Sequence, residues 1–431
     1  MKYLLLILLA FALLPITTTA QLNRILNRAA NKVQQRADNK VDQAIDKTLD
    51  EVEGKNSSAK KNEDNESATT HSTSAGAKSQ EEPITSFSKY DFVPGETIVY
   101  SEDFSQDEIG ELPVGWNTTG KGEAVTLNQL PGKWLRMYEN VVYFTANKDS
   151  FSKNFTIQFD LVLKLKSNGW MWPSIGFGFL SSGKESTTSN ALLKDEGKYA
   201  STEIKIDLGE NGRTSATLTS YFQRTHEFTS DIQSLASIEK AYGKIIHVAI
   251  QVQDRRIRAW FNGDKKFDLP MAVPTGHPYN QVFFQVGSSN YDDDALGFFI
   301  NNLKVAKGKP DLRHKFLETG KFSTTGILFD YQSAVIKAES YGVVKEMGTV
   351  LKDNPSVKVK IVGHTSSDGD DAANMELSKQ RSASVKALLV KEFGIEAERI
   401  LTEGMGETQP IADNQTKEGK TQNRRVEFIK L

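Results

Sequence analysis

The chain has 431 residues, which is too long for one compact core and predicts two or three domains. Hydrophobic residues make up 38% and charged residues 25% of it, and the formal net charge of -2 gives no reason to expect nucleic-acid binding. There is no cysteine, which excludes disulfides, thiolate metal sites, cysteine nucleophiles and a lipid-bearing cysteine.

Residues 1–20 have the pattern of a secretory signal. Lys2 supplies a positive charge, Leu4 to Leu14 form an apolar run, and small residues precede Gln21. The apolar run is shorter than the ~20 residues that a membrane span requires. We therefore expect residues 1–20 to be cut off on export and the mature protein to lie beyond the inner membrane, with an uncleaved anchor as the alternative.

Residues 21–54 carry apolar side chains at helical spacing and contain no proline, so they predict an amphipathic helix. This helix is either solvated or docks on a membrane, a partner or a second copy, since a basic first half and an acidic second half favour antiparallel self-association. Residues 55–85 are too polar to bury a core and predict a flexible, disordered linker.

Residues 86–309 contain short runs that alternate between apolar and polar residues, which predicts an all-β sandwich. FTIQFDLVLKL, from Phe155, predicts a half-buried antiparallel strand, and IIHVAIQVQ, from Ile245, repeats the pattern. Asn262-Gly263 is a tight-turn signal between two strands. We expect the first and last strands of this region to pair.

Three stretches carry a family resemblance over residues 100–305. EDFSQDEIGELPVGW from Glu102, RRIRAWFNG from Arg255 and FFINNLKV from Phe298 resemble the concanavalin A-like, or laminin-G-like, jelly rolls. Members of that superfold bind sugars, cleave them or only pack against partners. The resemblance therefore implies a jelly-roll domain whose role is still open.

The sandwich offers weak evidence for catalysis. Glu203 and Asp207 share one face of a strand, but four residues separate them by roughly 13 Å. Glycoside hydrolysis by paired carboxylates needs ~5–10 Å. We therefore expect no enzyme activity, although a partner from another strand is not excluded.

Two further groups in the sandwich are candidate binding residues. Trp170 and Trp172 are the tryptophans expected to be exposed and to stack on sugar rings. The run Asp292, Asp293 and Asp294 could supply oxygen ligands to calcium, although a solvated loop is the expected outcome.

Residues 321–431 predict a compact α/β domain with one sheet under two helices. TTGILFDYQSA predicts a short strand that runs into a polar turn, AVIKAESYGVVKEMGTVLKDNP from Ala334 a helix, 357–361 a strand, and 377–393 a second helix. RILTEGMG and NRRVEFIKL predict the remaining strands. The inward face of the first helix is Val343, Val344, Met347, Val350 and Leu351, and that of the second is Leu377, Val385, Leu388 and Leu389.

The loop GHTSSDGDDAANMELSKQR predicts a site for a ligand with two charges. Gly363 ends a strand, Asn374 is a good helix cap, and free amides at a helix start suit an anion. Arg381, placed near the helix start, can lean back to complete a carboxylate clamp. Three aspartates would favour an ammonium group nearby, as in an amino acid: Asp368, Asp370 and Asp371.

Several motifs in this region resemble the OmpA-like, or OmpA/MotB C-terminal, peptidoglycan-binding family. They are ILFDYQSA from Ile327, VGHT from Val362, the N-x-x-L-S-x-x-R run ending at Arg381, and GMGETQPIADNQTKEGKTQNRRVEF from Gly404. The resemblance implies non-covalent binding of the diaminopimelate in the peptidoglycan stem peptide, with Arg381 on its carboxylate. The implied site comprises Phe329, Asp330, Thr365, Ser366, Asp368, Asn374, Leu377, Arg381 and Arg425.

One departure from the family pattern concerns the ligand's positive charge. Ser366 stands where the family usually has aspartate, so that carboxylate is missing unless Asp368 substitutes for it. Losing one charge-assisted hydrogen bond costs ~1.5–3 kcal/mol, so we expect weaker but retained binding. The rival interpretation is a fold that only scaffolds. We also expect Arg424 or Arg425 to form a structural ion pair, and His364 to be a hydrogen-bonded loop residue.

Together these patterns predict a non-enzymatic protein of the cell envelope, in the periplasm or associated with the outer membrane. It would be anchored to peptidoglycan and would present a lectin-like sandwich to a glycan or an envelope protein. No cofactor and no nucleic-acid partner are expected. Two alternatives remain: a wall-anchored hydrolase that uses the sandwich, and an outer-membrane barrel of OmpA type in place of the sandwich.

Overall fold

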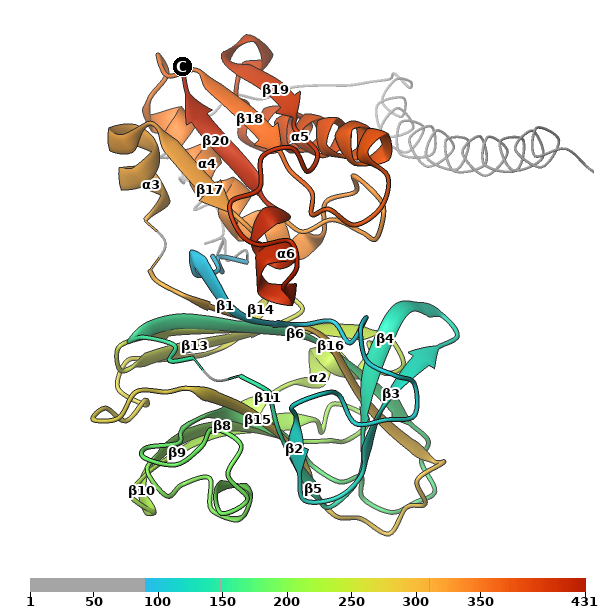
Figure 1. Ribbon diagram of the computed structural model, residues 1–431. Helices are drawn as coiled ribbons and strands as arrows, with labels where there is room; N and C mark the ends of the chain where they lie inside the picture. The colour runs from blue at the N-terminus through green and yellow to red at the C-terminus, as the bar shows by residue number, and fades with distance from the viewer. Residues whose placement is uncertain (1–89, 148, 310) are drawn as a thin grey trace, which may run out of the picture. The chain divides into compact units, whose positions relative to one another are not determined.

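The computed structural model describes residues 90–147, 149–309 and 311–431 (Figure 1). The predicted signal, amphipathic helix and linker lie outside these residues. Residues 85–431 group into one compact unit. Within the described part of the chain, no helix combines the length and the apolar character needed to cross a bilayer.

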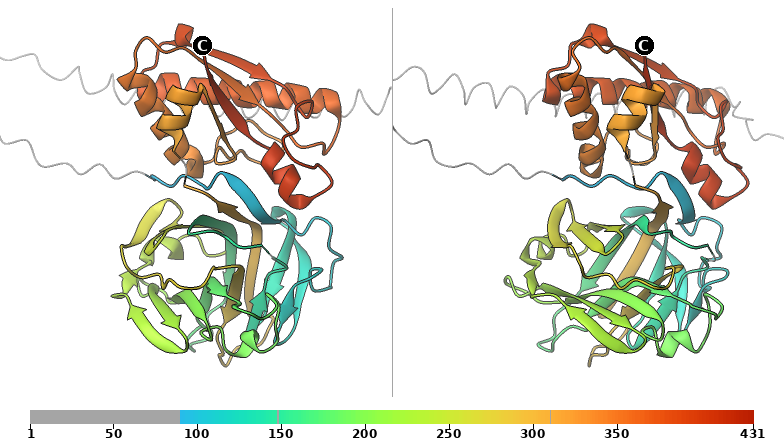
Figure 2. Two further views of the ribbon diagram at one scale, coloured as in Figure 1. Left: turned by 60° about the vertical axis from the view of Figure 1, so that its left-hand side comes forward. Right: turned by 90° about the vertical axis from the view of Figure 1, so that its left-hand side faces the viewer.

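Two antiparallel sheets make up residues 97–307 (Figures 1 and 2). The predicted pairing of the first and last strands is confirmed, because β1 (Thr97–Glu102) pairs with β16. In the first sheet the order is β14 (Asp264–Leu269), β13 (Arg256–Phe261), β12 (Ile245–Gln253), β6 (Asn154–Leu165), β16 (Leu296–Lys307), β4 (Leu130–Met137) and β3 (Gly122–Leu127).

The second sheet carries β11 (Gln233–Ser234) beside β9 (Ser215–Phe222). The short helix η1 (Leu192–Lys194) connects two of its strands, and α2 (Ala236–Glu239) lies between β11 and β12 of the first sheet. The strand order of the second sheet is β10 (Thr225–Thr229), β9, β8 (Ala200–Asp207), β7 (Ile175–Ser181), β15 (Gln281–Val286), β5 (Val141–Phe144) and β2 (Asn117–Thr118). The prediction of a two-sheet β domain is thus confirmed, whereas its jelly-roll family stays a prediction.

One hydrophobic core joins the two sheets. Phe159 of β6 meets the ring of Phe177 of β7 at 5.0 Å and that of Phe284 of β15 at 5.1 Å, both edge to face. The predicted turn at Asn262-Gly263 joins β13 to β14, and both residues have positive φ, 47° and 81°, as a tight hairpin turn requires.

The polar face of β6 is buried, so the prediction of a half-buried strand is wrong. Thr156, Gln158 and Asp160 are only 1%, 7% and 3% exposed. The segment that precedes β1 contacts this face at Thr156, whose Oγ1 accepts from the Gly95 amide at 2.9 Å, while Asp160 is hydrogen-bonded to His247 and Asn302 of the neighbouring strands. Strand alternation reports which side chains share a face and carries no information about what covers that face.

The last region is an α/β domain, as predicted. Its sheet has the order β17 (Lys321–Thr324), β20 (Val426–Lys430), β18 (Val359–Gly363) and β19 (Ile400–Gly404), with β18 and β19 parallel. The helices α4 (Tyr341–Asp353) and α5 (Asp371–Phe393) pack against it (Figure 1). Its shorter helices are α3 (Leu312–His314), η2 (Lys315–Thr319), η3 (Ala338–Ser340), η4 (Ala397–Arg399) and α6 (Lys417–Asn423).

The core of this domain contains the whole predicted apolar face of α4. It also contains Val93, Leu312 and Phe316, which precede the predicted boundary at residue 321. The strand predicted within TTGILFDYQSA is displaced, because beyond Thr324 this stretch forms only an isolated bridge between Phe329 and Ile336. The first strand of the sheet is β17, which ends at Thr324.

Helix α5 begins six residues before its predicted start, at Asp371 instead of Leu377. Leu377 is half-buried and outside the core, while Ser378 and Ser382 are fully buried. These small residues let the helix approach the ends of β18 and β19 closely. A Cβ added to Gly363 would lie 2.3 Å from the Ser378 carbonyl oxygen, so glycine is required there.

Candidate functional site

The start of α5 is capped by Asp370, whose carboxylate accepts from the Ala373 amide at 2.9 Å. The prediction that Asn374 caps this helix is therefore wrong. Arg381 lies ten residues after Asp371, about 15 Å along the helix axis. The clamp between its guanidinium and the amides at the helix start stays a prediction.

Arg381 lies under the loop that connects Phe329 to Ile336. Its Nε donates to the Ser333 carbonyl oxygen at 3.0 Å, and its guanidinium carbon lies 4.8 Å from the centre of the Phe329 ring. The two terminal nitrogens make no hydrogen bond or ion pair with the described residues. One of the five N–H donors of the guanidinium is thus held by the protein, and the four on the terminal nitrogens are available.

The charge on Arg381 is only weakly compensated. Burial, and next the positive charge of Arg424, lower the pKa of Arg381 to about 10. The group is still protonated at neutral pH. A half-buried cation without a carboxylate partner is costly, and a ligand carboxylate would offset that cost.

The loop over Arg381 is a small hairpin. The Asp330 amide donates to the Val335 carbonyl at 3.0 Å, and the Ser333 amide donates to the Asp330 carbonyl at 3.1 Å. The predicted site residues differ in exposure, since Phe329 is half-buried against Arg381 and Asp330 faces solvent. Phe329 therefore lines the Arg381 site, and Asp330 stands at its rim.

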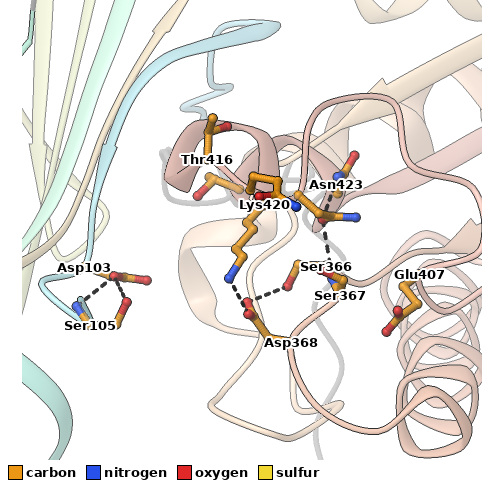
Figure 3. A network of polar contacts seen from close by, with 12 residues as sticks. Asp103, Ser105, Ser366, Ser367, Asp368, Glu407, Thr416, Lys420 and Asn423 are labelled. Atoms are coloured by element: carbon orange, nitrogen blue, oxygen red, sulfur yellow. Dashed lines mark hydrogen bonds and ion pairs between the residues drawn. The ribbon is translucent and has the colours of Figure 1, made fainter.

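Ser366 and Asp368 contact each other in the loop after β18. Ser366 Oγ donates to Asp368 Oδ2 at 3.0 Å. Asp368 also accepts from Lys420 of α6 at 2.6 Å (Figure 3), and Arg424 lies 3.6 Å away. Burial would raise the pKa of Asp368, but the bonds from Lys420 and Ser366 outweigh it and lower the pKa.

Asn374 ties the loop to the end of β19. It is 7% exposed, and its Nδ2 donates to the Asp368 carbonyl at 3.1 Å and to Glu407 Oε2 at 2.6 Å. Thr365 is also buried, and its amide donates to the Gly406 carbonyl at 2.9 Å. These bonds fix the backbone on which Ser366 and Asp368 stand.

A family model described as the OmpA family matches residues 328–424, which contain this whole arrangement. The C-terminal part of the chain is an OmpA-like domain. The chain is 42% identical over 101 residues to outer membrane porin F of Pseudomonas aeruginosa, covering 23% of this chain and 29% of that protein. It is 44% identical over 102 residues to the probable lipoprotein YiaD of Escherichia coli, covering 24% and 46%.

Only part of each relative is therefore matched, since the chain spans less than half the length of these two proteins. Among solved structures, the cell wall anchor of the T6SS from Pseudomonas aeruginosa is 29% identical, with a TM-score of 0.23 and coverage of 25% of this chain and 78% of that one. The peptidoglycan-associated lipoprotein from Burkholderia pseudomallei is 22% identical, also with a TM-score of 0.23, covering 25% and 89%. Likeness at that TM-score supports no inference by itself.

Arg425 has a structural role in the OmpA-like domain. Its side chain is 2% exposed, and its Nε lies 2.8 Å from Glu427 Oε1. The predicted structural ion pair is thus confirmed at Arg425, whose place among the binding residues stays a prediction. His364 is buried too, with Nε2 3.6 Å from Glu427, which is beyond hydrogen-bonding distance.

Sequence reasoning missed three side chains of the site. Lys420 and Arg424 lie beside Asp368, and Glu407 binds Asn374. Their positions follow from the turn of α6 and from the loop after β19, which bring distant residues to the loop after β18. The capping residue Thr416, whose Oγ1 accepts from the Gly419 amide at 2.9 Å, was a signal for that turn.

In the sandwich, the two candidate tryptophans differ in their exposure to solvent. Trp170 is 62% exposed, whereas Trp172 packs on the core with its ring 5.8 Å from that of Tyr242. Trp170 alone is thus placed to stack on a ligand. Asp293 pairs with Lys121, and the part of the chain that the structure describes holds no cluster of three histidine or carboxylate side chains arranged for a metal.

The two carboxylates considered for catalysis have separate partners. Glu203 accepts from Gln285, and burial raises the pKa of Glu203 to about 6. Asp207 is exposed and lies 3.1 Å from Lys205. Glu203 therefore has the protonation behaviour of a general acid, but Asp207 is engaged by its own neighbour.

Proposed function

We propose that the OmpA-like domain anchors the protein to peptidoglycan without a covalent bond. In this proposal Arg381 pairs through its two terminal nitrogens with the carboxylate of a diaminopimelate in the stem peptide. Phe329 and the hairpin that follows it form one wall, and the loop of Thr365, Ser366 and Asp368, fixed by Asn374, forms the other. The observation that carries the proposal is the uncompensated, half-buried guanidinium of Arg381.

The wider setting follows from the same proposal. A wall anchor acts where peptidoglycan is found, so the protein would be exported and reside in the periplasm, associated with the outer membrane. The names of the relatives, an outer membrane porin and a probable lipoprotein, support this placement.

For the sandwich we propose a non-enzymatic role in which it binds a glycan or an envelope protein. The exposed Trp170 supports a surface of this kind. The second candidate is a wall-anchored glycan hydrolase, which the raised pKa of Glu203 favours. A panel of glycans, scored both for retention and for release of product, separates the two, since a lectin retains a glycan without shortening it.

The anchoring proposal is tested by co-sedimentation with purified sacculi. Arg381→Ala should abolish most of the binding, because it removes the group that meets the ligand carboxylate. Arg313→Ala is the matched control, since Arg313 forms an exposed pair with Asp353 in the same domain. Binding of Arg381→Ala at the level of wild type would overturn the proposal.

A further inference from the structure

An amino-acid ligand brings an ammonium group as well as a carboxylate, and Ser366 supplies no charge for it. Asp368 is the nearest acid to Ser366, but its carboxylate is already neutralised. Lys420 lies 2.6 Å from one of its oxygens, and Arg424 lies 3.6 Å from the other. A ligand ammonium at Asp368 would have to displace or face two cations, so this residue latches the loop to α6 instead.

Glu407 is the other acid beside this loop, and it has no cation. It follows β19, is half-buried, and accepts from Asn374 Nδ2 at 2.6 Å. No lysine, arginine or histidine of the described residues lies within ion-pair distance of it. In Figure 3 Glu407 and Asp368 lie on opposite sides of Ser366 and Ser367.

The bond from Asn374 holds Glu407 in place without using up its capacity. An ionised carboxylate offers about four acceptor positions, of which Asn374 occupies one. The remaining acceptor positions of Glu407 are open to a ligand ammonium.

The spacing to Arg381 fits a single amino-acid group. Asn374 and Arg381 are seven residues apart on α5, so they share one helix face about 10 Å apart along the axis. A helical arginine leans toward the helix start and shortens that gap. An amino-acid centre, with a carboxylate and an ammonium on one carbon atom, is the ligand that we test against this gap.

We propose that Glu407 holds the ammonium group of the ligand while Arg381 holds its carboxylate. This inference rests on the proposed function and names the chemical class that the site selects, which is a free α-amino acid centre with both groups charged. Glu407 would thus supply the negative charge that the family usually has as an aspartate at position 366 and that Ser366 lacks.

The test uses the full chain and a soluble stem tripeptide that ends in meso-diaminopimelate, with affinity measured by calorimetry. Glu407→Gln keeps an acceptor for Asn374 but loses the charge, and it should weaken binding about tenfold or more. Glu403→Gln is the matched control, because Glu403 pairs with Lys360 on the exposed side of β19. That control should bind as wild type does.

Two further arms separate a ligand contact from a structural role. The double variant Ser366→Asp with Glu407→Gln should regain most of the lost affinity, since it returns a carboxylate to the loop. Against the tripeptide in which the free amine of diaminopimelate is acetylated, wild type and Glu407→Gln should bind equally.

If Arg381→Ala binds the tripeptide as wild type does, the proposed function fails. If Arg381→Ala loses binding while Glu407→Gln keeps it, only the role of Glu407 is refuted.

Discussion

Replacement of Glu427 by glutamine should destabilise the OmpA-like domain more than any exposed charge change. Glu427 is 4% exposed at its side chain and holds two cations, Arg425 and Lys321, each at 2.8 Å. Lys321 is 51% exposed and can turn to water when the charge is lost, whereas Arg425 is 2% exposed and cannot. The cost is therefore that of an unpaired buried arginine, about 3–5 kcal/mol.

The same pair gives the domain a dependence on pH. Burial alone would raise the pKa of Glu427, but His364, Lys321 and Arg425 hold it well below its usual value of 4.5. The unfolded chain therefore binds more protons than the folded one in acid, and stability rises with pH there. The contribution is complete above about pH 4.5 and is lost as the pH falls toward the folded pKa.

Urea unfolding monitored by circular dichroism, at pH 7 and in steps down to pH 3, measures both effects. Glu427→Gln should lower the unfolding free energy at pH 7 and should lose the part of the acid dependence that Glu427 supplies. The control Glu403→Gln removes a pair whose members are 39% and 32% exposed, and it should cost under about 1 kcal/mol. A cost for Glu427→Gln as small as that of the control would refute this account of the pair.

Three other substitutions test separate parts of the structure. Ser366→Asp should strengthen binding to sacculi by about tenfold or more, because it adds a charge-assisted bond, and unchanged or weaker binding would argue against it. Lys417→Ala should lower the unfolding free energy in urea at pH 7, since Lys417 pairs with the buried Glu102, and an unchanged free energy would show that the pair is dispensable. Gly363→Ala should cost about 1–3 kcal/mol in the same assay, because the added carbon would lie 2.3 Å from the Ser378 oxygen, and a neutral effect would mean that α5 shifts freely.

Periodicity predicted the elements of the OmpA-like domain well where apolar side chains mark the buried face. The face of α4 from Val343 to Leu351 is buried as expected. The start of α5 was missed because its first turns are polar and its buried residues include Ser378 and Ser382. Small side chains such as these allow a helix to pack closely against a glycine. Because they are polar, a hydrophobic pattern does not identify them as buried.

Local sequence patterns could not predict which residues are buried, or which residues pair, through contacts with segments far away in the sequence. Asp160 stands at a polar position of an alternating strand, yet it is 3% exposed, and it is hydrogen-bonded to His247 of β12 and Asn302 of β16. Arg424 and Arg425 are neighbours in sequence, and only the fold shows that Arg425 turns inward to Glu427 while Arg424 lies beside Asp368. Arg381 could be selected from the N-x-x-L-S-x-x-R run, whereas its hydrogen bond to Ser333 depends on a hairpin 48 residues earlier.

The structure of the full chain with the stem tripeptide bound tests the central claim most directly. The account predicts the diaminopimelate carboxylate on the two terminal nitrogens of Arg381, with Phe329 alongside and the bond from Arg381 to Ser333 retained. A tripeptide bound elsewhere on the domain, with the terminal nitrogens of Arg381 left without it, would contradict the assignment of this site.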